Sequence, residues 1–341
     1  MNYVVHRSNA ADALRSDTTD RRVAFIDLDP AIEGLREAAL AGLSLPQKAI
    51  PPKFIYDAQG AALFERICTL PEYYPTRSEI EILRRHARDI ADRMGPHAQL
   101  VEYGAGAAEK VRALLSAMER PERYVAIDVA REQLRAVTSR LAAEYPELGV
   151  TAICADYTQP VPLPQATRGA RVGFFPGSTI GNFTHEEAVE FLRAAARTLA
   201  GGALLIGVDL KKEKARLDAA YNDSAGITAA FILNILGRMN RELGADFDLG
   251  QFAYVGEYSE ENGRVEMFVQ SRIKQRVIVA GQRFEFAAGE KLHVEYSCKY
   301  DAAEFQELAR RAGFAPSGLW IDHAGNFSVH YLLAPPTGGA G

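Results

Sequence analysis

The feature that most constrains this chain is a regular alternation of short apolar segments with helix-like segments between residues 77 and 210. The apolar segments are AQLVEYG (98–104), RYVAIDV (123–129), VTAICADY (150–157), RVGFFPGS (171–178) and GALLIGVDL (202–210). Segments with helical periodicity separate them, and one begins with the capping-box pair Thr184 and Glu187. Strands that alternate with helices in this way predict a parallel sheet with helices on both faces.

The helix before the first of these strands also has a predicted start. The stretch TRSE (76–79) has the capping-box form, with Thr76 followed three residues later by Glu79. We therefore expect Thr76 to open one helix that runs to about Met94.

The alternation breaks after Asp209. A helical region (224–244) is followed by strand-like segments with an Asn-Gly hairpin signal, and a helix then precedes two final strands (318–334). Five parallel strands that end in an antiparallel pair are the order of a class I methyltransferase sheet, which is α/β and Rossmann-like with seven mostly parallel strands. The remaining segments predict a second α+β domain that binds the substrate.

The predicted domain boundaries follow from this division. Residues 20–77 and 212–299 form the discontinuous substrate-binding domain, and residues 78–211 and 300–335 form the methyltransferase domain.

Charge and cysteine usage exclude several classes of protein. The chain has 39 basic and 44 acidic residues, a net charge of −5, so a nucleic-acid partner is not expected. The three cysteines, Cys68, Cys154 and Cys298, are far apart in sequence and predict neither a disulfide framework nor a metal site. With no long apolar run and no signal-peptide pattern, we expect a cytoplasmic monomer that acts on a small molecule without contacting a membrane.

A glycine-rich turn and two acidic strand ends indicate the cofactor. The stretch VEYGAGAAEK places Gly104 and Gly106 between a strand and a helix, but the third glycine of a dinucleotide fingerprint is replaced by Glu109. Asp128 follows the next strand, where a carboxylate can accept both ribose hydroxyls, and Asp156 follows the third, near an adenine amino group. This series favours S-adenosylmethionine over NAD.

Longer motifs resemble the histidine-specific methyltransferases, the ergothioneine-pathway enzymes that trimethylate the α-amino group of L-histidine. The resemblance extends over nearly all of residues 51–333. It rests on the motifs PPKFIYDAQGAALFERICTLPEYYPTRSE, GAGAAEK, GSTIGNF, AYNDSAGITAAF, NRELGADFD, VEMFVQ, FAAGEKLHVEYSCKY and WIDHAGNFSVHYLLA.

The resemblance implies a role for particular residues. The cofactor would contact Gly104, Gly106, Lys110, Asp128 and Asp156. The substrate carboxylate would contact Tyr73, Asn182 and Tyr221, while Tyr56 would lie close to the amine, Met267 would form a pocket wall, and Glu295 with Ser297 would hold the imidazole. Each residue also has a purely structural interpretation, such as a capping aspartate, a packing tyrosine or a solvated Lys110.

The segment LHVEYSCKY (292–300) alternates apolar and polar residues throughout. It predicts a strand with Glu295 and Ser297 on its polar face and Tyr296 on the opposite face. The resemblance implies that this polar face is turned toward the ring of histidine.

Three other interpretations remain open at this point. The chain could methylate another amine, such as a tryptophan derivative, although an indole offers only one polar ring atom to Glu295 and Ser297. It could bind the cofactor without catalysis, or it could be a nicotinamide enzyme, which the missing third glycine disfavours.

Overall fold

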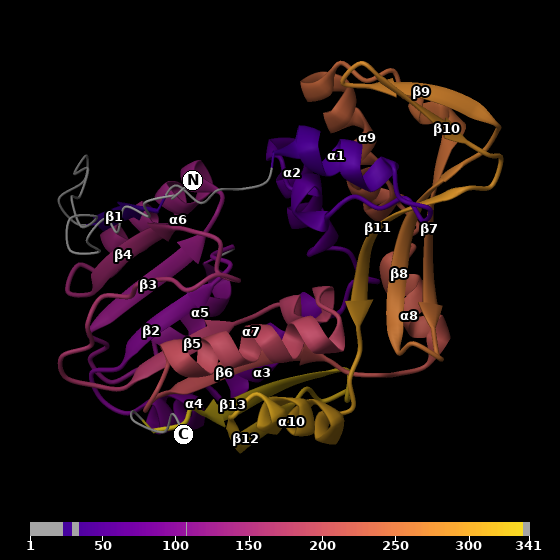
Figure 1. Ribbon diagram of the computed structural model, residues 1–341. Helices are drawn as coiled ribbons and strands as arrows, with labels where there is room; N and C mark the ends of the chain where they lie inside the picture. Colours follow the sequence, from indigo (N-terminus) through magenta and orange to yellow (C-terminus); the bar gives the residue numbers. More distant parts are fainter. Residues whose placement is uncertain (1–22, 29–33, 107, 337–341) are drawn as a thin grey trace, which may run out of the picture.

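The computed structural model describes residues 23–28, 34–106 and 108–336. Within these residues eight strands form one large sheet (Figure 1). They are β1 (Val23–Asp27), β2 (Gln99–Tyr103), β3 (Arg123–Asp128), β4 (Gly149–Cys154), β5 (Arg171–Phe175), β6 (Ala203–Asp209), β12 (Ala315–Ile321) and β13 (Phe327–Leu333). Their order is β1-β4-β3-β2-β5-β6-β13-β12, and β13 is antiparallel to both of its neighbours.

Seven of these strands have the order expected for a class I methyltransferase, and the predicted fold class is therefore confirmed. The eighth strand, β1, pairs in parallel with β4 at the edge of the sheet. The predicted substrate-binding domain begins at residue 20, and this boundary is wrong for β1, which belongs to the large sheet. Its burial pattern alternates and Phe25 packs in the core of the large sheet, but so short a strand carries no sequence signal that identifies its partner.

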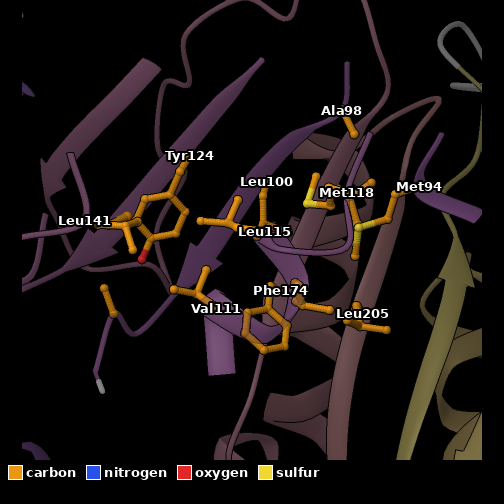
Figure 2. Packing of buried hydrophobic residues seen from close by; sticks show 14 of the residues in the cluster. Met94, Ala98, Leu100, Val111, Leu115, Met118, Tyr124, Leu141, Phe174 and Leu205 are labelled. Atoms are coloured by element: carbon orange, nitrogen blue, oxygen red, sulfur yellow. The ribbon is translucent and has the colours of Figure 1, made fainter. Parts of the chain in front are cut away.

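Helices cover both faces of the large sheet. One face packs against α3 (Pro75–Arg85), α4 (Ala87–Met94), α5 (Glu109–Leu115) and α6 (Arg131–Glu144). Figure 2 shows part of this core, in which Leu100, Tyr124 and Phe174 of three strands meet Val111 and Leu115 of α5. The other face packs against α7 (His185–Thr198) and α10 (Ala302–Arg311).

A separate buried cluster forms the core of a second unit. Its elements are α1 (Leu35–Leu43), η1 (Pro52–Ile55), α2 (Ala58–Ile67), α8 (Lys214–Tyr221), α9 (Ile227–Leu243), η3 (Leu249–Gln251), β7 (Phe252–Ser259), β8 (Arg264–Ser271), β9 (Gln275–Val279), β10 (Gln282–Phe286) and β11 (Lys291–Cys298). In the described part of the chain, β11-β8-β7 form one small sheet and β10-β9 another. Figure 1 shows β11 running from this unit toward the large sheet. This buried cluster is distinct from the two that pack on the large sheet, and the predicted domain boundaries stay a prediction.

The helix predicted to start at Thr76 differs from the prediction. Tyr74 precedes the first residue of α3, Pro75 occupies the first turn, and the helix ends before His86, after which α4 begins. The Glu79 side chain is fully buried instead of capping the helix. The second predicted capping box, Thr184 with Glu187, is present at the start of α7.

Candidate active site

The glycine turn lies directly after β2, in the middle of the large sheet. Gly104 has φ +76°, which a residue with a side chain adopts only at a cost, and its amide donates to the carbonyl of Ile127 at 2.9 Å. A side chain at Gly106 would meet no atom of the described residues within 4 Å, so these residues leave space beside the turn. On one side of β2 the order continues through β3 and β4, and on the other through β5 and β6, which makes this the switch point where ligands bind such sheets.

Asp128 and Asp156 follow the two neighbouring strands at the same edge. Asp128 is the last residue of β3, and its carboxylate accepts from the amide of Ala130 at 2.8 Å. Burial raises the pKa of Asp128. Asp156 lies two residues after β4 and accepts from the amide and hydroxyl of Thr158 at 2.9 and 2.7 Å. The structure thus brings both acidic groups to one edge with the glycine turn, and each also stabilises its own loop.

Lys110 makes a structural contact in the first turn of α5. Its ammonium lies 2.6 Å from the carboxylate of Glu79, which also accepts from the amide of Gly177 at 2.9 Å. Lys110 therefore ties α5 to α3 and to the loop after β5. A contact between Lys110 and the cofactor stays a prediction.

The predicted unbroken alternation of β11 is wrong because the strand contains a β-bulge. The pairing register between β11 and β8 shifts between His293 and Glu295. His293 pairs with Phe268, and Glu295 pairs with the next residue, Met267. The bulge adds one residue, Val294, and thereby changes which face the following residues occupy.

The bulge determines which side chains point inward. Glu295 and Ser297 lie opposite the buried Met267 and Val265 of β8, and both are only 6% exposed. Tyr296 lies on the outer face, where its ring is 5.3 Å from that of His293. Glu295 and Ser297 therefore lie on the interior side of the small sheet, while Tyr296 is on the other face as expected.

Glu295 contacts the methyltransferase sheet through Asn182. The Asn182 amide donates to Glu295 Oε1 at 2.9 Å from the short helix η2 (Thr179–Asn182). A side chain at Gly181 would come within 2.7 Å of the Cys298 carbonyl, so only glycine permits η2 and β11 to approach this closely. Burial raises the pKa of Glu295 to about 7, although the charge of Lys299 opposes the shift.

Ser297 and Tyr221 form a pair of hydroxyl groups beside Glu295. The Tyr221 hydroxyl donates to Ser297 Oγ at 3.0 Å. Lys299 donates to the Tyr221 oxygen at 2.7 Å and to Ser297 Oγ at 2.9 Å. These three residues bring the end of α8 together with the end of β11.

Behind this pair lies a buried charge network centred on Asp209, the last residue of β6. Its carboxylate lies 2.6 Å from the ammonium groups of both Lys299 and Lys212, and it accepts from the Tyr74 hydroxyl at 2.9 Å. Burial alone would raise the pKa of Asp209, but the two ammonium groups outweigh it and lower that pKa. Burial lowers the pKa of Lys212 to about 8 despite its contact with Asp209.

Tyr56 and Tyr73 belong to an aromatic cluster in the second unit. The ring of Tyr56 contacts Phe64 and Phe231 edge-on at 5.7 and 5.2 Å between centroids. Tyr73 lies edge-on to Tyr221 at 6.3 Å. Solvent reaches 40% of Tyr56, yet the protein atoms around its hydroxyl and the charge of Glu295 raise its pKa, so the phenol is neutral at pH 7.

Comparison with known proteins identifies the family. The sequence profile of the histidine-specific, S-adenosylmethionine-dependent methyltransferases matches residues 35–334. The chain belongs to this family. The match confirms the predicted resemblance and begins earlier than the motif at residue 51.

Relatives in this family are similar over most of the chain. A histidine N-alpha-methyltransferase of Mycolicibacterium smegmatis is 42% identical over 312 residues, which cover 89% of this chain and 96% of that protein. One of Mycobacterium tuberculosis is 39% identical, with 86% and 93% covered. Ergothioneine biosynthesis protein 1 of Neurospora crassa is 32% identical, with 84% of this chain but 33% of that longer protein covered.

The open turn at Gly106 and the two carboxylates at the adjacent strand ends fit the cofactor that this family uses. Gly104, Gly106, Asp128 and Asp156 would hold S-adenosylmethionine at the carboxyl edge of the sheet. The donor set is suited to a nucleoside because carboxylates accept from ribose hydroxyls and from an amino group.

The sequence did not lead us to predict the buried charge network centred on Asp209. Lys299 continues the polar face of Glu295 and Ser297 by one further step, and Asp209 ends a strand as Asp128 does. Both signals were therefore readable in the sequence. Neither Lys212 nor Tyr74 carries such a signal, because both reach Asp209 only through the tertiary fold.

Proposed function

We propose that this protein transfers methyl groups from S-adenosylmethionine to the α-amino nitrogen of L-histidine. Three transfers would give the trimethylammonium betaine hercynine, the first product of ergothioneine biosynthesis. The observation that carries the proposal is the placement of Glu295 and Ser297 on the inner face of β11, with Glu295 held by Asn182. The names of the mycobacterial relatives support the same substrate.

The imidazole is recognised by Glu295 and Ser297 in this proposal. A carboxylate accepts from a ring N–H, and a hydroxyl donates to a bare ring nitrogen. Met267 lies opposite Glu295 in β8 and is buried, as suits a pocket wall. A site built from such groups rejects analogues that lack the ring nitrogens, because its own buried groups would be left unpaired.

The carboxylate of histidine is proposed to meet Asn182, Tyr73 and Tyr221. Tyr221 is well suited to this contact because its oxygen accepts from the ammonium of Lys299, which strengthens the hydroxyl as a donor. The buried network also has one more ammonium than carboxylate, and this surplus positive charge favours an anion nearby.

The chemistry requires a neutral amine rather than a strong base. S-adenosylmethionine supplies a methyl group on a sulfonium, which is already a good leaving group. A free α-amino group has a pKa near 8, so its deprotonation costs little at physiological pH. The oxygen of the neutral Tyr56 phenol is suited to accept from an amine N–H, which leaves the lone pair free to face the methyl group, and the aromatic face of Tyr56 suits the growing cation.

The test is a mass-spectrometric assay of the purified protein with S-adenosylmethionine and an equimolar mixture of the twenty amino acids. A gain of three methyl groups on histidine alone is the expected result. Methylation of another amine, such as tryptophan, would keep the cofactor but overturn the roles of Glu295 and Ser297. Cofactor binding in calorimetry without any methylated product would favour a non-catalytic protein.

The monomeric state and the cytoplasmic location stay predictions. Among the described residues, no helix is both long and apolar enough to cross a membrane.

A further inference from the structure

Lys299 is a fully buried lysine whose three hydrogen-bond donors are all in use. Its ammonium lies 2.6 Å from Asp209 Oδ2, 2.7 Å from the Tyr221 oxygen and 2.9 Å from Ser297 Oγ. An ammonium has three N–H donors and no acceptor. Both hydroxyl oxygens must therefore accept from Lys299, and neither can donate to it.

This arrangement leaves one hydroxyl proton without a protein acceptor. The oxygens of Tyr221 and Ser297 are 3.0 Å apart, and one hydrogen bond between them uses one of their two protons. In the described part of the chain, neither hydroxyl donates to another protein group. Because the Tyr221 hydroxyl donates to Ser297 Oγ, the proton without a protein acceptor is that of Ser297, and Ser297 therefore presents a donor to a ligand.

Glu295 presents the opposite polarity on the same face of β11. One of its oxygens already accepts from the Asn182 amide, and although burial raises its pKa to about 7, the positive charge of Lys299 opposes that shift and favours the ionised, accepting form. An acceptor and a donor thus lie side by side, two residues apart on the strand.

We propose that Lys299 is a positioning residue that sets this polarity, so that the site selects a ring with both an N–H and a bare nitrogen. Neutral imidazole has both groups, whereas pyrrole and indole have only the N–H. This inference rests on the proposed function and specifies which form of the ring the site accepts. Lys299 acts through Ser297 and Tyr221 rather than by touching the substrate.

The experiment compares histidine with its pyrrole analogue, in which a C–H replaces the bare ring nitrogen. The measured quantity is the ratio of kcat/KM for the two substrates, determined by methyl incorporation. In the unchanged protein we expect histidine to be preferred by roughly 10- to 100-fold, because the pyrrole leaves the Ser297 proton unpaired.

Three variants isolate the role of Lys299. Lys299→Met opens a lone pair on the Tyr221 oxygen to which the Ser297 proton can turn when the ring offers no acceptor, so the ratio should fall about tenfold or more. Lys299→Arg also carries a group that only donates, so the ratio should be kept even if kcat falls. Lys212→Met is the matched control, since it removes a lysine from the same Asp209 carboxylate but contacts neither hydroxyl, and it should leave the ratio unchanged.

The outcomes separate this inference from the proposed function. If the unchanged protein does not methylate histidine, the proposed function fails. If it does, and a folded Lys299→Met variant keeps the full ratio, the inference fails while the function stands. If Lys299→Met shows no cooperative thermal transition, Ser297→Ala decides, because an unchanged ratio without the proposed donor would overturn the inference.

Discussion

The polar groups at the carboxyl edge of the large sheet and those on the inner face of β11 are satisfied in different ways. Asp128 and Asp156 bond to backbone amides two residues away in their own loops. Glu295 and Ser297 bond instead to Asn182 and Lys299, and through Lys299 to Asp209 at the end of β6. The cofactor side is thus built locally, whereas the substrate side depends on several distant segments. A substitution on the cofactor side should therefore affect only its own loop. A substitution on the substrate side should also affect the distant segments that bond to it.

The largest effect is expected from Glu295→Ala. Removal of the ring acceptor should lower kcat/KM for histidine by a factor on the order of 10⁴ and relax selectivity toward other aromatic amino acids. Steady-state kinetics with histidine and tryptophan measures both effects. Glu257→Ala, an exposed carboxylate on the same small sheet, is the control. Histidine turnover that survives Glu295→Ala would remove this residue from ring recognition.

Asp209→Asn should show how strongly the stability of the protein depends on the buried network behind the substrate side. The change leaves the fully buried Lys299 without its carboxylate, and breaking such a pair costs about 3–5 kcal/mol of unfolding free energy. Urea unfolding followed by circular dichroism measures this loss. Glu307→Gln disrupts only an exposed ion pair with Arg310 and should change stability by less than about 1 kcal/mol. Equal losses in the two variants would contradict a buried network.

Glu295→Gln should stabilise the fold at alkaline pH while abolishing activity. The pKa of Glu295 is raised to about 7 in the folded chain from 4.5, so the unfolded chain loses its proton first as pH rises. The stability from this group is therefore complete below pH 4.5, declines up to pH 7 and stays low above it. At pH 8 the variant should be more stable by about 3 kcal/mol.

Urea unfolding at pH 4.5 and pH 8 tests this pH dependence. The stability difference between Glu295→Gln and the unchanged protein should be small at the lower pH. Glu257 is 62% exposed, so the stability difference between Glu257→Gln and the unchanged protein should not increase from pH 4.5 to pH 8. A constant difference would mean that burial does not raise the pKa of Glu295.

Tyr56→Phe should have an intermediate effect on catalysis. Loss of the hydroxyl that orients the amine should slow methylation by roughly 10- to 100-fold and leave mono- and dimethylated products. Time-resolved mass spectrometry of the products is the measurement. Tyr145→Phe is the control, because within the described residues it removes a hydroxyl that hydrogen-bonds the exposed Ser116. Normal trimethylation by the Tyr56 variant would refute the role of the hydroxyl.

Asp128→Asn should give the smallest effect and test the local nature of the cofactor side. Loss of one charged hydrogen bond should raise KM for S-adenosylmethionine about tenfold and leave KM for histidine unchanged. Glu132→Gln, exposed in the first turn of α6, is the control. A comparable rise in KM for histidine would show that the two sides are coupled.

The sequence predicted the local part of this molecule well. Strand ends and glycine turns are short-range signals, so seven of the eight strands of the large sheet and the positions of Gly104, Asp128 and Asp156 could be predicted from them. The resemblance supplied Asn182, Glu295, Ser297 and Tyr221, and the structure brings these four residues together, although their roles stay predictions.

The remainder depends on contacts between distant segments. The pairing of β1 with β4, the buried place of Glu79 and the link from Lys212 and Tyr74 to Asp209 leave no periodic trace in the sequence. The bulge at Val294 is hidden for another reason. The letters of LHVEYSCKY alternate without interruption, so only the pairing with β8 shows the extra residue.

Because of that bulge, the number of residues in β11 constrains the site more than the identity of most of those residues. The extra residue shifts the phase of the strand, so that Leu292 before it and Glu295 and Ser297 after it all face inward. Deleting or inserting a single residue in this stretch would reverse the phase and turn both recognition groups outward. The outward positions, such as Tyr296, do not share this constraint. We expect the number of residues between Leu292, Glu295 and Ser297 to be the same in active relatives. The residue types on the outer face should vary freely.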